Sequence, residues 1–314
     1  MVVVRVGQSA YDTVQSLARE RTMVTDAGHL YEMVGSADTQ RLKSADLLVV
    51  QSGTHVDKRV LSALNDCAVL TTTSGTDHID VETAKELGVC VLRAPLLRRD
   101  AVVHMAFAEM IFHNRRLGAI WAGAEAGRWG RGDLPSLQPK GLNDATVAII
   151  GLGVIGRRMA EFLSFSGARV LGVEPEPVNT DVEVVSLAYA LAVADVVTLH
   201  CDLNPSTHGL IQAKEIASMK RGSVLINLAR GGLLDTDAAI HAVERGHIAG
   251  LSVDCFEQEP YSTMAQAKQP GVHFTPHAAG YTCGLTAASA QKIVDVANAL
   301  SQGQIPEHTV LPFA

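Results

Sequence analysis

A glycine-rich segment near the middle of the chain restricts the possible folds more than any other feature. Gly151, Gly153 and Gly156 follow the apolar run Ala145–Ile150 directly and lead into a helical stretch, Ile155–Ser166. In this context each glycine has a separate use: a tight turn, a close approach of the backbone to a pyrophosphate, and close packing of helix on strand. The helix N-terminus also offers N–H groups to phosphates. The segment therefore predicts a dinucleotide-binding βαβ unit, with an ordinary strand-to-helix turn as the alternative.

An acidic residue beyond this loop bears on the choice of dinucleotide. Glu174 ends the next apolar run. A carboxylate at that place accepts hydrogen bonds from the ribose hydroxyls and repels a 2′-phosphate. The residues that follow, Pro175, Glu176 and Pro177, include no Arg or Lys to bind such a phosphate. NAD is therefore expected rather than NADP.

Short apolar runs alternate with helical stretches along the whole chain, which is the pattern of βαβ units. A first series predicts strands at Val2–Val6, Leu47–Val50, Ala68–Thr72 and Val89–Leu92, and helices at Tyr11–Glu20, Lys58–Asn65 and Val81–Leu87. A second series predicts strands at Thr146–Ile150, Arg169–Val173, Val196–His200, Ser223–Leu228, Ala249–Val253 and Val272–Phe274, and helices at Ile155–Ser166 and Leu187–Val193. The two series predict an α/β protein with two doubly wound parallel-sheet domains.

Two further helical stretches connect or complete these series. The stretch from Asp100 to about Leu117 is apolar on nearly every side, so we expect a helix that is buried on several faces. The last stretch, Gly284–Leu300, is rich in Ala and fits either domain. The boundary between the two series lies near Leu96–Asp100.

Composition limits the partners. The chain has 47% hydrophobic and 19% charged residues, a mix too apolar for disorder, and its formal net charge of −7 argues against nucleic acid or an anionic membrane as a partner. The uncharged window Gln269–Gln291 is long enough to span a bilayer, but Pro270 and Pro276 make that interpretation costly. The apolar run Val2–Val6 is too short for a signal peptide. The five cysteines include no CxxC spacing, so a reduced, cytoplasmic protein is expected.

The 12 histidines raise the question of a metal site. The one His-x-x-x-His spacing joins His273 to His277, and Pro276 between them is incompatible with the helical geometry of a zinc site. No metal is expected.

Arg230, Glu259 and His277 each follow a predicted strand of the second series, at the sheet edge where α/β folds bind ligands. Singly, each fits a surface ion pair, a solvated loop or a structural histidine. Together they fit hydride transfer between a hydroxy acid and nicotinamide. Histidine can take the hydroxyl proton, a neighbouring carboxylate stabilises and orients the charged ring, and a guanidinium binds the substrate carboxylate through two hydrogen bonds.

With these residues, the chain resembles the D-isomer-specific 2-hydroxyacid dehydrogenases. The resemblance covers nearly the whole chain and rests on the segments SGTDHIDVETAKELGV (Ser74–Val89), GLGVIGRRMA, LHCDLNPSTHGLI (Leu199–Ile211), MKRGSVLINLARGGLLDTDA (Met219–Ala238), AGLSVDCFEQEP and TPHAAGYT. It implies that Arg230, Glu259 and His277 are catalytic. It also implies the substrate-binding residues Ser74, Gly75, Thr76, Arg230 and His277, and the cofactor-binding residues Gly151, Gly153, Val154, Ile155, Gly156, Glu174, His200, Ala229, Asp254 and Gly280.

The resemblance also implies a domain organisation. Residues 1–98 with 284–314 would form a flavodoxin-like substrate domain, and residues 99–283 an NAD-binding Rossmann domain, with a cleft between them that holds the active site. The implied reaction interconverts a small D-2-hydroxy acid and its 2-oxo acid. A homodimer formed mainly through the cofactor domain is expected.

Two departures from the family concern single positions. His104 and Met105 stand where many members carry Glu-His, and Asp202 replaces a usual proline after Leu-His-Cys. Glu259 argues against the formate-oxidising relatives, which carry Gln there. The segment Gln51–Thr54 lacks the Arg by which many phosphoglycerate-oxidising members bind phosphate.

Three questions stay open from the residues alone. Arg98 and Arg99 lie where the domains should meet, so either one faces the substrate and favours an acidic compound or both are solvated loop charges. The same scaffold also serves NAD-sensing corepressors, for which this chain shows no basic patch. A phosphite-type dehydrogenase, which uses similar residues, is the third possibility.

Overall fold

The computed structural model describes residues 1–35, 39–262, 264 and 269–312. Contacts divide the chain into two compact units, and the chain enters the second unit after Arg98 and leaves it after Gly280. The first unit therefore joins Met1–Arg98 to Tyr281–Ala314, and the second unit is Arg99–Gly280. The return to the first unit lies slightly earlier than the expected boundary at residue 284. Each unit is described by itself below.

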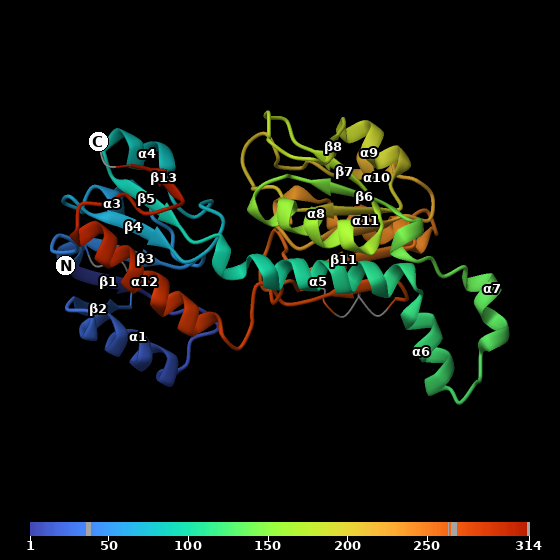
Figure 1. The fold of residues 1–314 in the computed structure, drawn as a ribbon, viewed down its shortest axis with the longest axis horizontal. Coiled ribbons are helices and arrows are strands. Elements are labelled where there is room, and N and C mark those ends of the chain that lie inside the picture. The colour runs from blue at the N-terminus through green and yellow to red at the C-terminus, as the bar shows by residue number, and fades with distance from the viewer. Residues whose placement is uncertain (36–38, 263, 265–268, 313–314) are drawn as a thin grey trace. The chain divides into compact units, whose positions relative to one another are not determined.

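The first unit is built on a six-stranded sheet in the order β13-β5-β4-β3-β1-β2 (Figure 1). Its strands are β1 Val2–Val6, β2 Leu30–Val34, β3 Leu47–Val50, β4 Ala68–Thr71, β5 Cys90–Arg93 and β13 Thr309–Leu311. Neighbouring strands run parallel, except that β13 is antiparallel to β5. The order 2-1-3-4-5 of the first five strands is that of the flavodoxin-like doubly wound fold.

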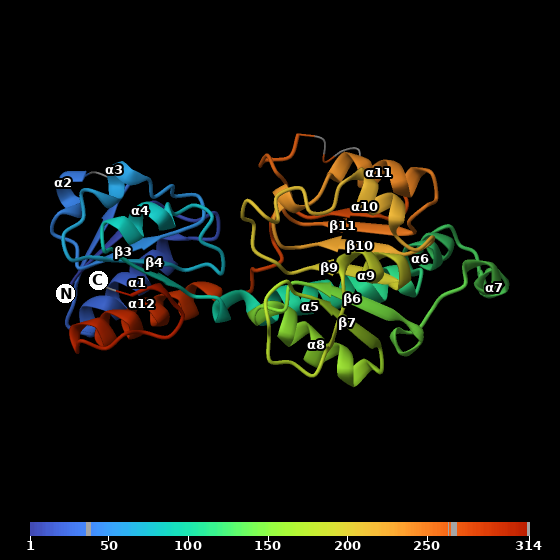
Figure 2. The same cartoon turned by 90° about the horizontal axis from the view of Figure 1, so that it is seen from above.

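Helices cover both faces of this sheet (Figure 2). They are α1 Val14–Asp26, α2 Thr39–Leu42, α3 Lys58–Leu61, α4 Val81–Glu86 and α12 Leu285–Ser301. Val3 and Leu47 pack with α1 and α12, whereas Val4 and Leu48 pack with the helices of the opposite face. Because successive side chains of a strand point to opposite faces, covering both faces requires continuous apolar runs. The last helix, which the sequence pattern leaves unassigned, belongs to this unit beside α1.

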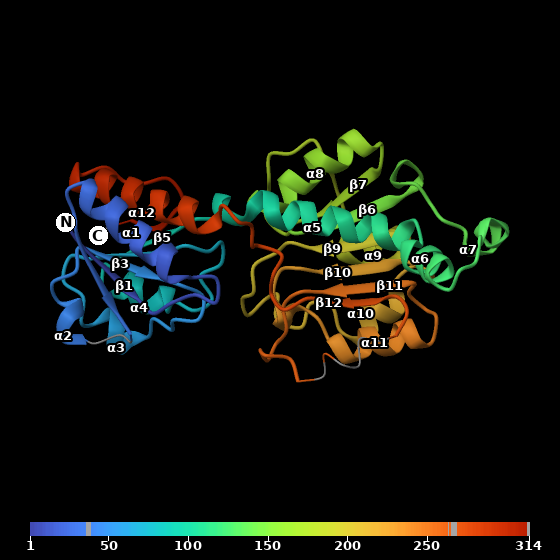
Figure 3. The same ribbon diagram turned by 90° about the horizontal axis from the view of Figure 1, so that it is seen from below.

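The second unit is built on a seven-stranded parallel sheet in the order β12-β11-β10-β9-β6-β7-β8 (Figure 3). Its strands are β6 Thr146–Ile150, β7 Arg169–Val173, β8 Glu183–Val184, β9 Val196–Leu199, β10 Val224–Asn227, β11 Gly250–Val253 and β12 Val272–Phe274. The chain moves from β6 to β7 on one side and then returns to β9 on the other. The topological switch point therefore lies beside the carboxyl end of β6, where doubly wound folds bind their ligands.

The helices of the second unit also form two layers. They are α5 Leu96–Asn114, α6 Leu117–Glu125, α7 Leu134–Leu137, α8 Val154–Ser166, α9 Leu187–Val193, α10 Ala213–Ser218 and α11 Thr236–Glu244. Helices α5 and α8 pack on one face of the sheet, and α9, α10 and α11 on the other. Short 3-10 turns lie at Arg131–Asp133, Leu142–Asp144 and Gly231–Leu233.

The structure corrects several expected elements. The helix expected from Asp100 to about Leu117 is instead α5 followed by α6, because Arg116 adopts a left-handed φ of 55° and ends the helical path. Helix α1 begins at Val14, since Thr13 caps it. Strand β2 was not expected. Within the described residues, no helix combines the length and the apolar character that a membrane span requires.

Candidate active site

The glycine-rich loop joins β6 to α8, and its three glycines meet different constraints. Gly151 has a left-handed φ of 94°, and a Cβ there would lie 2.6 Å from the Cys201 nitrogen. A Cβ on Gly156 would lie 1.9 Å from the Gly151 carbonyl oxygen. At Gly153 no described atom lies within 4 Å of an added Cβ. Two glycines are therefore required by packing, and the third leaves open space beside the loop.

The N-terminus of α8 lies beside this open space and has N–H groups that are unpaired within the described chain. Some helices begin at a side-chain cap, as α1 does at Thr13 and α11 at Asp235, whereas others, such as α6 and α12, have none. Helix α8 begins at Val154, and its N-cap residue, Gly153, makes no side-chain cap. The N–H groups of its first residues, Val154 and Ile155, are thus available to an anion at the positive end of the helix dipole. The loop therefore fits the pyrophosphate of a dinucleotide.

Glu174 lies at the end of β7, as the sequence predicted, and it contacts the loop itself. Its Oε2 accepts a hydrogen bond of 2.9 Å from the Leu152 N–H. One carboxylate oxygen is thereby fixed beside the glycine loop. This geometry holds the acidic group where a ribose hydroxyl could donate to it, so the predicted role fits the structure.

The other predicted cofactor residues follow neighbouring strands. His200 follows β9, but its ring is buried and its Nε2 lies 3.0 Å from the Thr198 hydroxyl. Burial lowers the pKa of His200 to about 4, so the ring is neutral at pH 7. Ala229 follows β10, where its N–H donates to the Asn227 side chain. Gly280 closes the unit.

Glu259 and His277 are brought together, as the sequence predicted. His277 Nδ1 lies 2.9 Å from Oε2 and 3.1 Å from Oε1 of Glu259. The Phe256 N–H donates to Glu259 Oε1 at 3.0 Å and so fixes the carboxylate. Because Nδ1 is engaged, Nε2 is the ring atom that can exchange a proton with a ligand. Both side chains are about two-fifths exposed, at 44% and 39%.

A buried carboxylate shapes the loop that carries His277. Asp254 is 1% exposed. Its Oδ1 accepts hydrogen bonds from the Thr275 hydroxyl at 2.6 Å and the Ala278 N–H at 2.7 Å, and its Oδ2 accepts one from the Ala279 N–H at 2.9 Å. Its carbonyl oxygen accepts the His277 N–H at 2.8 Å. Asp254, predicted from the resemblance to contact the cofactor, therefore also holds this loop in shape.

Arg230 follows β10 and is half-buried. Its Nη1 donates to the Ala229 carbonyl at 2.8 Å, and its own carbonyl accepts from the Asn227 side chain at 2.9 Å. A Cβ on the next residue, Gly231, would lie 1.9 Å from the Phe256 carbonyl carbon. The absence of a side chain there lets the loop of Arg230 pass directly against the loop that carries Glu259. The sites of the three predicted catalytic residues thus lie on adjoining strand ends of one sheet.

In the first unit, the loop Ser74–Thr76 follows β4. The Gly75 carbonyl accepts from the Thr73 hydroxyl at 3.0 Å, and the Thr76 carbonyl accepts from the Ile79 N–H at 2.9 Å. The N–H groups of Ser74, Gly75 and Thr76 donate to no acceptor among the described residues. The loop therefore presents donors that suit a carboxylate.

The two arginines that the sequence left open differ in surroundings. Arg99 donates to both oxygens of Asp100 at 3.1 Å, and Arg158 donates to the same carboxylate at 3.0 Å. The hydrogen bond from Arg99 lowers the pKa of Asp100 most, and the bond from Arg158 adds to this effect. Burial acts in the opposite direction but does not cancel it, so the pKa stays below its usual value. Arg98 instead lines a polar pocket of the first unit and lies over the Tyr11 ring.

One further residue was left open by the sequence. The exposed ring of His104 lies 5.4 Å, centroid to centroid, from the ring of Phe162 on α8. Both residues belong to helices of the second unit. This contact is the only one that the structure gives for the His104 ring in the described chain.

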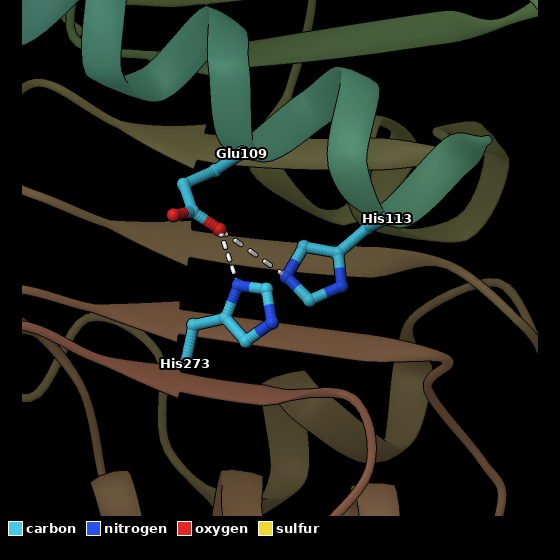
Figure 4. A group of neighbouring side chains, drawn as sticks. All are labelled: Glu109, His113 and His273. Carbon is cyan, nitrogen blue, oxygen red and sulfur yellow. Dashed lines mark hydrogen bonds and ion pairs between the residues drawn. The ribbon is translucent and has the colours of Figure 1, made fainter. Parts of the chain in front are cut away.

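The structure also assembles a polar cluster that the sequence did not predict (Figure 4). Glu109 and His113 project from α5, and His273 projects from β12. Glu109 Oε2 lies 2.7 Å from His273 Nδ1 and 3.6 Å from His113 Nε2. The Ser252 hydroxyl, on β11, donates to Glu109 at 2.8 Å and lies 2.9 Å from His113 Nε2. The spacing of Glu109 and His113 by one helical turn was the signal available in the sequence.

Burial and charge set the protonation states in this cluster. Burial lowers the pKa of His113 to about 4. For Glu109, burial acts to raise the pKa, but the hydrogen bonds from His273 and Ser252 and the nearby imidazoles leave it below the usual value. At pH 7 the cluster therefore combines an ionised carboxylate with a neutral imidazole at His113.

Known proteins resemble this chain in sequence and in fold. The profile of a family described as D-isomer specific 2-hydroxyacid dehydrogenase, NAD binding domain, matches residues 107–279. A hydroxypyruvate reductase from Thermotoga maritima is 31% identical over 261 residues, which cover 81% of this chain and 83% of that protein. A D-3-phosphoglycerate dehydrogenase from Methanocaldococcus jannaschii is 30% identical over 278 residues, 86% of this chain and 52% of that protein.

Among solved structures, D-lactate dehydrogenase from Aquifex aeolicus, complexed with NAD and lactic acid, has a TM-score of 0.85 and 26% identity, and the match covers 99% of this chain and 100% of that one. The chain belongs to the D-isomer-specific 2-hydroxyacid dehydrogenase family. Its cofactor is NAD, as the glycine loop and Glu174 predicted. The chain spans about half the length of the phosphoglycerate dehydrogenases that it matches.

Proposed function

We propose that the protein is an NAD-dependent oxidoreductase that interconverts a D-2-hydroxy acid and its 2-oxo acid. The observation that carries this proposal is the pairing of His277 Nδ1 with the Glu259 carboxylate at 2.9 Å. The pair follows strands of the same sheet that carries the glycine-rich loop and the uncapped start of α8. A histidine oriented in this way is suited to move a proton near neutral pH.

The chain's residues divide the work of the reaction. In the reductive direction His277 donates a proton from Nε2 to the oxygen that becomes the hydroxyl, and Glu259 stabilises the positive charge of the ring beforehand. Arg230 binds the substrate carboxylate through its guanidinium and polarises the adjacent carbonyl. NADH, when bound, supplies the hydride that reduces the carbonyl carbon, and NAD accepts it in the oxidative direction.

The binding residues follow from the same loops. Gly151, Gly153 and Gly156, with the N–H groups at the start of α8, are proposed to bind the pyrophosphate, and Glu174 the adenosine ribose. The N–H groups of Ser74–Thr76 are proposed to bind the substrate carboxylate from the first unit. We assign the first unit to the substrate and the second unit to the cofactor.

The relatives suggest which substrates to test first. They are named for hydroxypyruvate, phosphoglycerate and lactate, all small 2-hydroxy or 2-oxo acids. We propose a small 2-oxo acid whose variable end lies near Arg98, the arginine whose guanidinium lies over the Tyr11 ring. The guanidinium of Arg98 would favour a second carboxylate or another acidic substituent on the substrate.

The test is His277→Gln, measured by NADH oxidation with a panel of 2-oxo acids. We expect turnover to fall by roughly 10²–10⁴-fold, the usual contribution of a general acid, while NADH binding is kept. His241→Gln is the matched control, because the exposed His241 pairs with Glu244 at 2.8 Å on α11 and belongs to neither group of candidate ligands or catalytic residues. Loss of NADH binding in His277→Gln, or normal turnover, would contradict the proposal.

The rival functions separate in the same assay. Failure of the unmodified protein to oxidise NADH with any 2-oxo acid, while still binding NADH, would favour an NAD-sensing protein. Reduction of NAD driven by phosphite would favour the phosphite-type reaction.

We also propose a homodimer in the cytoplasm. Trp121 on α6 and Trp129 after it are 52% and 90% exposed in the single chain. Helices α6 and α7 extend away from the sheet of the second unit (Figure 1). Covering two exposed indoles is a general reason for chain association. Light scattering coupled to size exclusion, over a range of protein concentrations, measures the oligomeric state.

A further inference from the structure

We propose that Glu109, His113 and His273 bind a divalent transition-metal ion, with Zn²⁺ as the ion that best suits these donors. Two imidazoles and one carboxylate are common zinc ligands. No residue of this group takes part in the proposed hydride-transfer site. The proposal therefore stands independently of the proposed function.

The geometry of the three ligand atoms fits a single small ion. Each residue offers one ligand atom, and these atoms lie within 4.8 Å of one another. Ligands at about 2.0–2.1 Å from a tetrahedral zinc ion lie roughly 3.4 Å apart. The distances of 2.7 Å and 3.6 Å from Glu109 Oε2 to the two imidazole nitrogens lie on either side of that value. The two histidines from α5 and β12 converge on the Glu109 carboxylate, so one ion could contact all three residues (Figure 4).

The elements that carry the ligands are well placed to hold them. Glu109 and His113 lie one turn apart on the long helix α5, so their side chains share a face of that helix. His273 lies on β12, the edge strand beside β11. Two ligands at this spacing on a helix, completed by a third residue from another element, are a recurring arrangement for zinc.

The charge balance of the cluster also favours a cation. The Glu109 side chain is 17% exposed, and no Lys or Arg of the described chain pairs with it. Its partners are the two histidines and the Ser252 hydroxyl. A divalent cation would compensate this largely buried carboxylate, which is otherwise costly to hold away from water.

The cluster is accessible from one side and supported on the other. The His273 side chain is 28% exposed, whereas that of His113 is 3% exposed. An ion can therefore reach the ligands past His273. On the buried side, the Ser252 hydroxyl hydrogen-bonds Glu109 Oε2 and His113 Nε2, the same two atoms that are proposed as ligands, so a bound ion would replace these two hydrogen bonds. A bound ion would tie α5 to β12, the strand that leads to the loop of His277.

The experiment uses the full chain after dialysis against a chelator. Zn²⁺ is titrated by calorimetry, and Co²⁺ is used as a probe because its visible absorption reports nitrogen and oxygen coordination. We expect one ion per chain, and an increase in the unfolding temperature with added Zn²⁺. His273→Gln keeps a side chain that can hydrogen-bond Glu109, and it should weaken binding beyond the roughly 10–100-fold that loss of an outer partner costs.

Control variants locate the ion. Cys255, Glu259 and His277 form a second group of possible ligands, so His277→Gln tests that site. His241→Gln tests exposed histidines in general. Retention of binding in both variants, with loss in His273→Gln, supports the proposal. Failure of the unmodified protein to bind Zn²⁺, or binding in His273→Gln equal to that of the unmodified protein, would overturn it, provided that circular dichroism shows each variant folded without metal.

Discussion

A substitution of Gly156 by alanine would test the glycine loop where its packing is tightest. The added Cβ would lie 1.9 Å from the Gly151 carbonyl oxygen and 3.2 Å from a methyl group of Ile149. The close contact is with backbone, which cannot rotate away as a side chain can. Helix α8 and the loop must therefore separate by about 1.5 Å to restore an ordinary contact.

The magnitude follows from two opposing effects. Overpacking of this kind costs about 1–3 kcal/mol, and alanine gains about 1 kcal/mol over glycine inside a helix. Because the clash involves backbone, we expect the upper part of the range, for a net loss of about 2 kcal/mol in the free energy of unfolding. Moving the N–H groups of α8 away from the pyrophosphate should weaken NADH binding at least roughly tenfold, or about 1.4 kcal/mol.

Gly153→Ala is the matched control within the same loop. Its backbone φ of −67° suits alanine, and no described atom lies within 4 Å of the new Cβ. Stability should stay within about 1 kcal/mol or rise slightly, while the methyl group occupies the space proposed for the phosphates and weakens NADH binding. Urea unfolding and NADH fluorescence titration measure the two quantities. Unchanged NADH binding in Gly153→Ala, or unchanged stability in Gly156→Ala, would refute this account of the loop.

Four other substitutions test the remaining features of the site. Because burial lowers the pKa of His200 from 6.5 to about 4, the unfolded chain binds a proton between these values that the folded chain does not. The free energy of unfolding should therefore fall as the pH drops through this range, by up to roughly 3 kcal/mol, and the fall should be shallower in His200→Gln, as measured by urea unfolding at each pH. Arg98→Ala should lower kcat/KM for dicarboxylic more than for monocarboxylic 2-oxo acids, whereas Arg99→Ala should leave the ranking unchanged; the same ranking in both variants would show that Arg98 does not contact the substrate. Glu259→Gln should keep NADH binding and lose part of the roughly 10²–10⁴-fold contribution of His277, and unchanged steady-state kinetics would contradict the pairing.

Most strands that the sequence predicted lie inside a sheet covered on both faces, and the edge strand β12, Val272–Phe274, was predicted as well. Val2–Val6, Thr146–Ile150 and Arg169–Val173 were predicted with the bounds that the structure gives. Strand β2, Leu30–Val34, was missed because it is an edge strand with exposed residues at alternate positions, so its pattern is not a continuous apolar run. Helix α10, Ala213–Ser218, is too short to show a helical period.

The functional residues show a similar division. Arg230, Glu259 and His277 were predicted because each follows a strand, and the order of strand ends is visible in the sequence. The hydrogen bonds of Asp254 depend on how the chain turns after β12, which no local pattern encodes. Glu109 and His273 come together only because α5 packs across the face of the sheet near β11 and β12. Contacts between residues this far apart in sequence arise from packing, and single-sequence patterns do not contain them.

The position of His277 illustrates why a short segment can define a proton donor. Its backbone has a left-handed φ of 54°, a conformation that is costly for any residue other than glycine. The hydrogen bonds that Asp254 accepts from Ala278 and Ala279, on the far side of His277, compensate this cost. Glu259 then fixes the ring through Nδ1. Both carboxylates follow the single strand β11, so backbone and ring are positioned from one neighbouring strand end. This arrangement fixes the direction of Nε2 although the ring is not buried. A partly exposed ring suits a residue that exchanges protons with an incoming substrate.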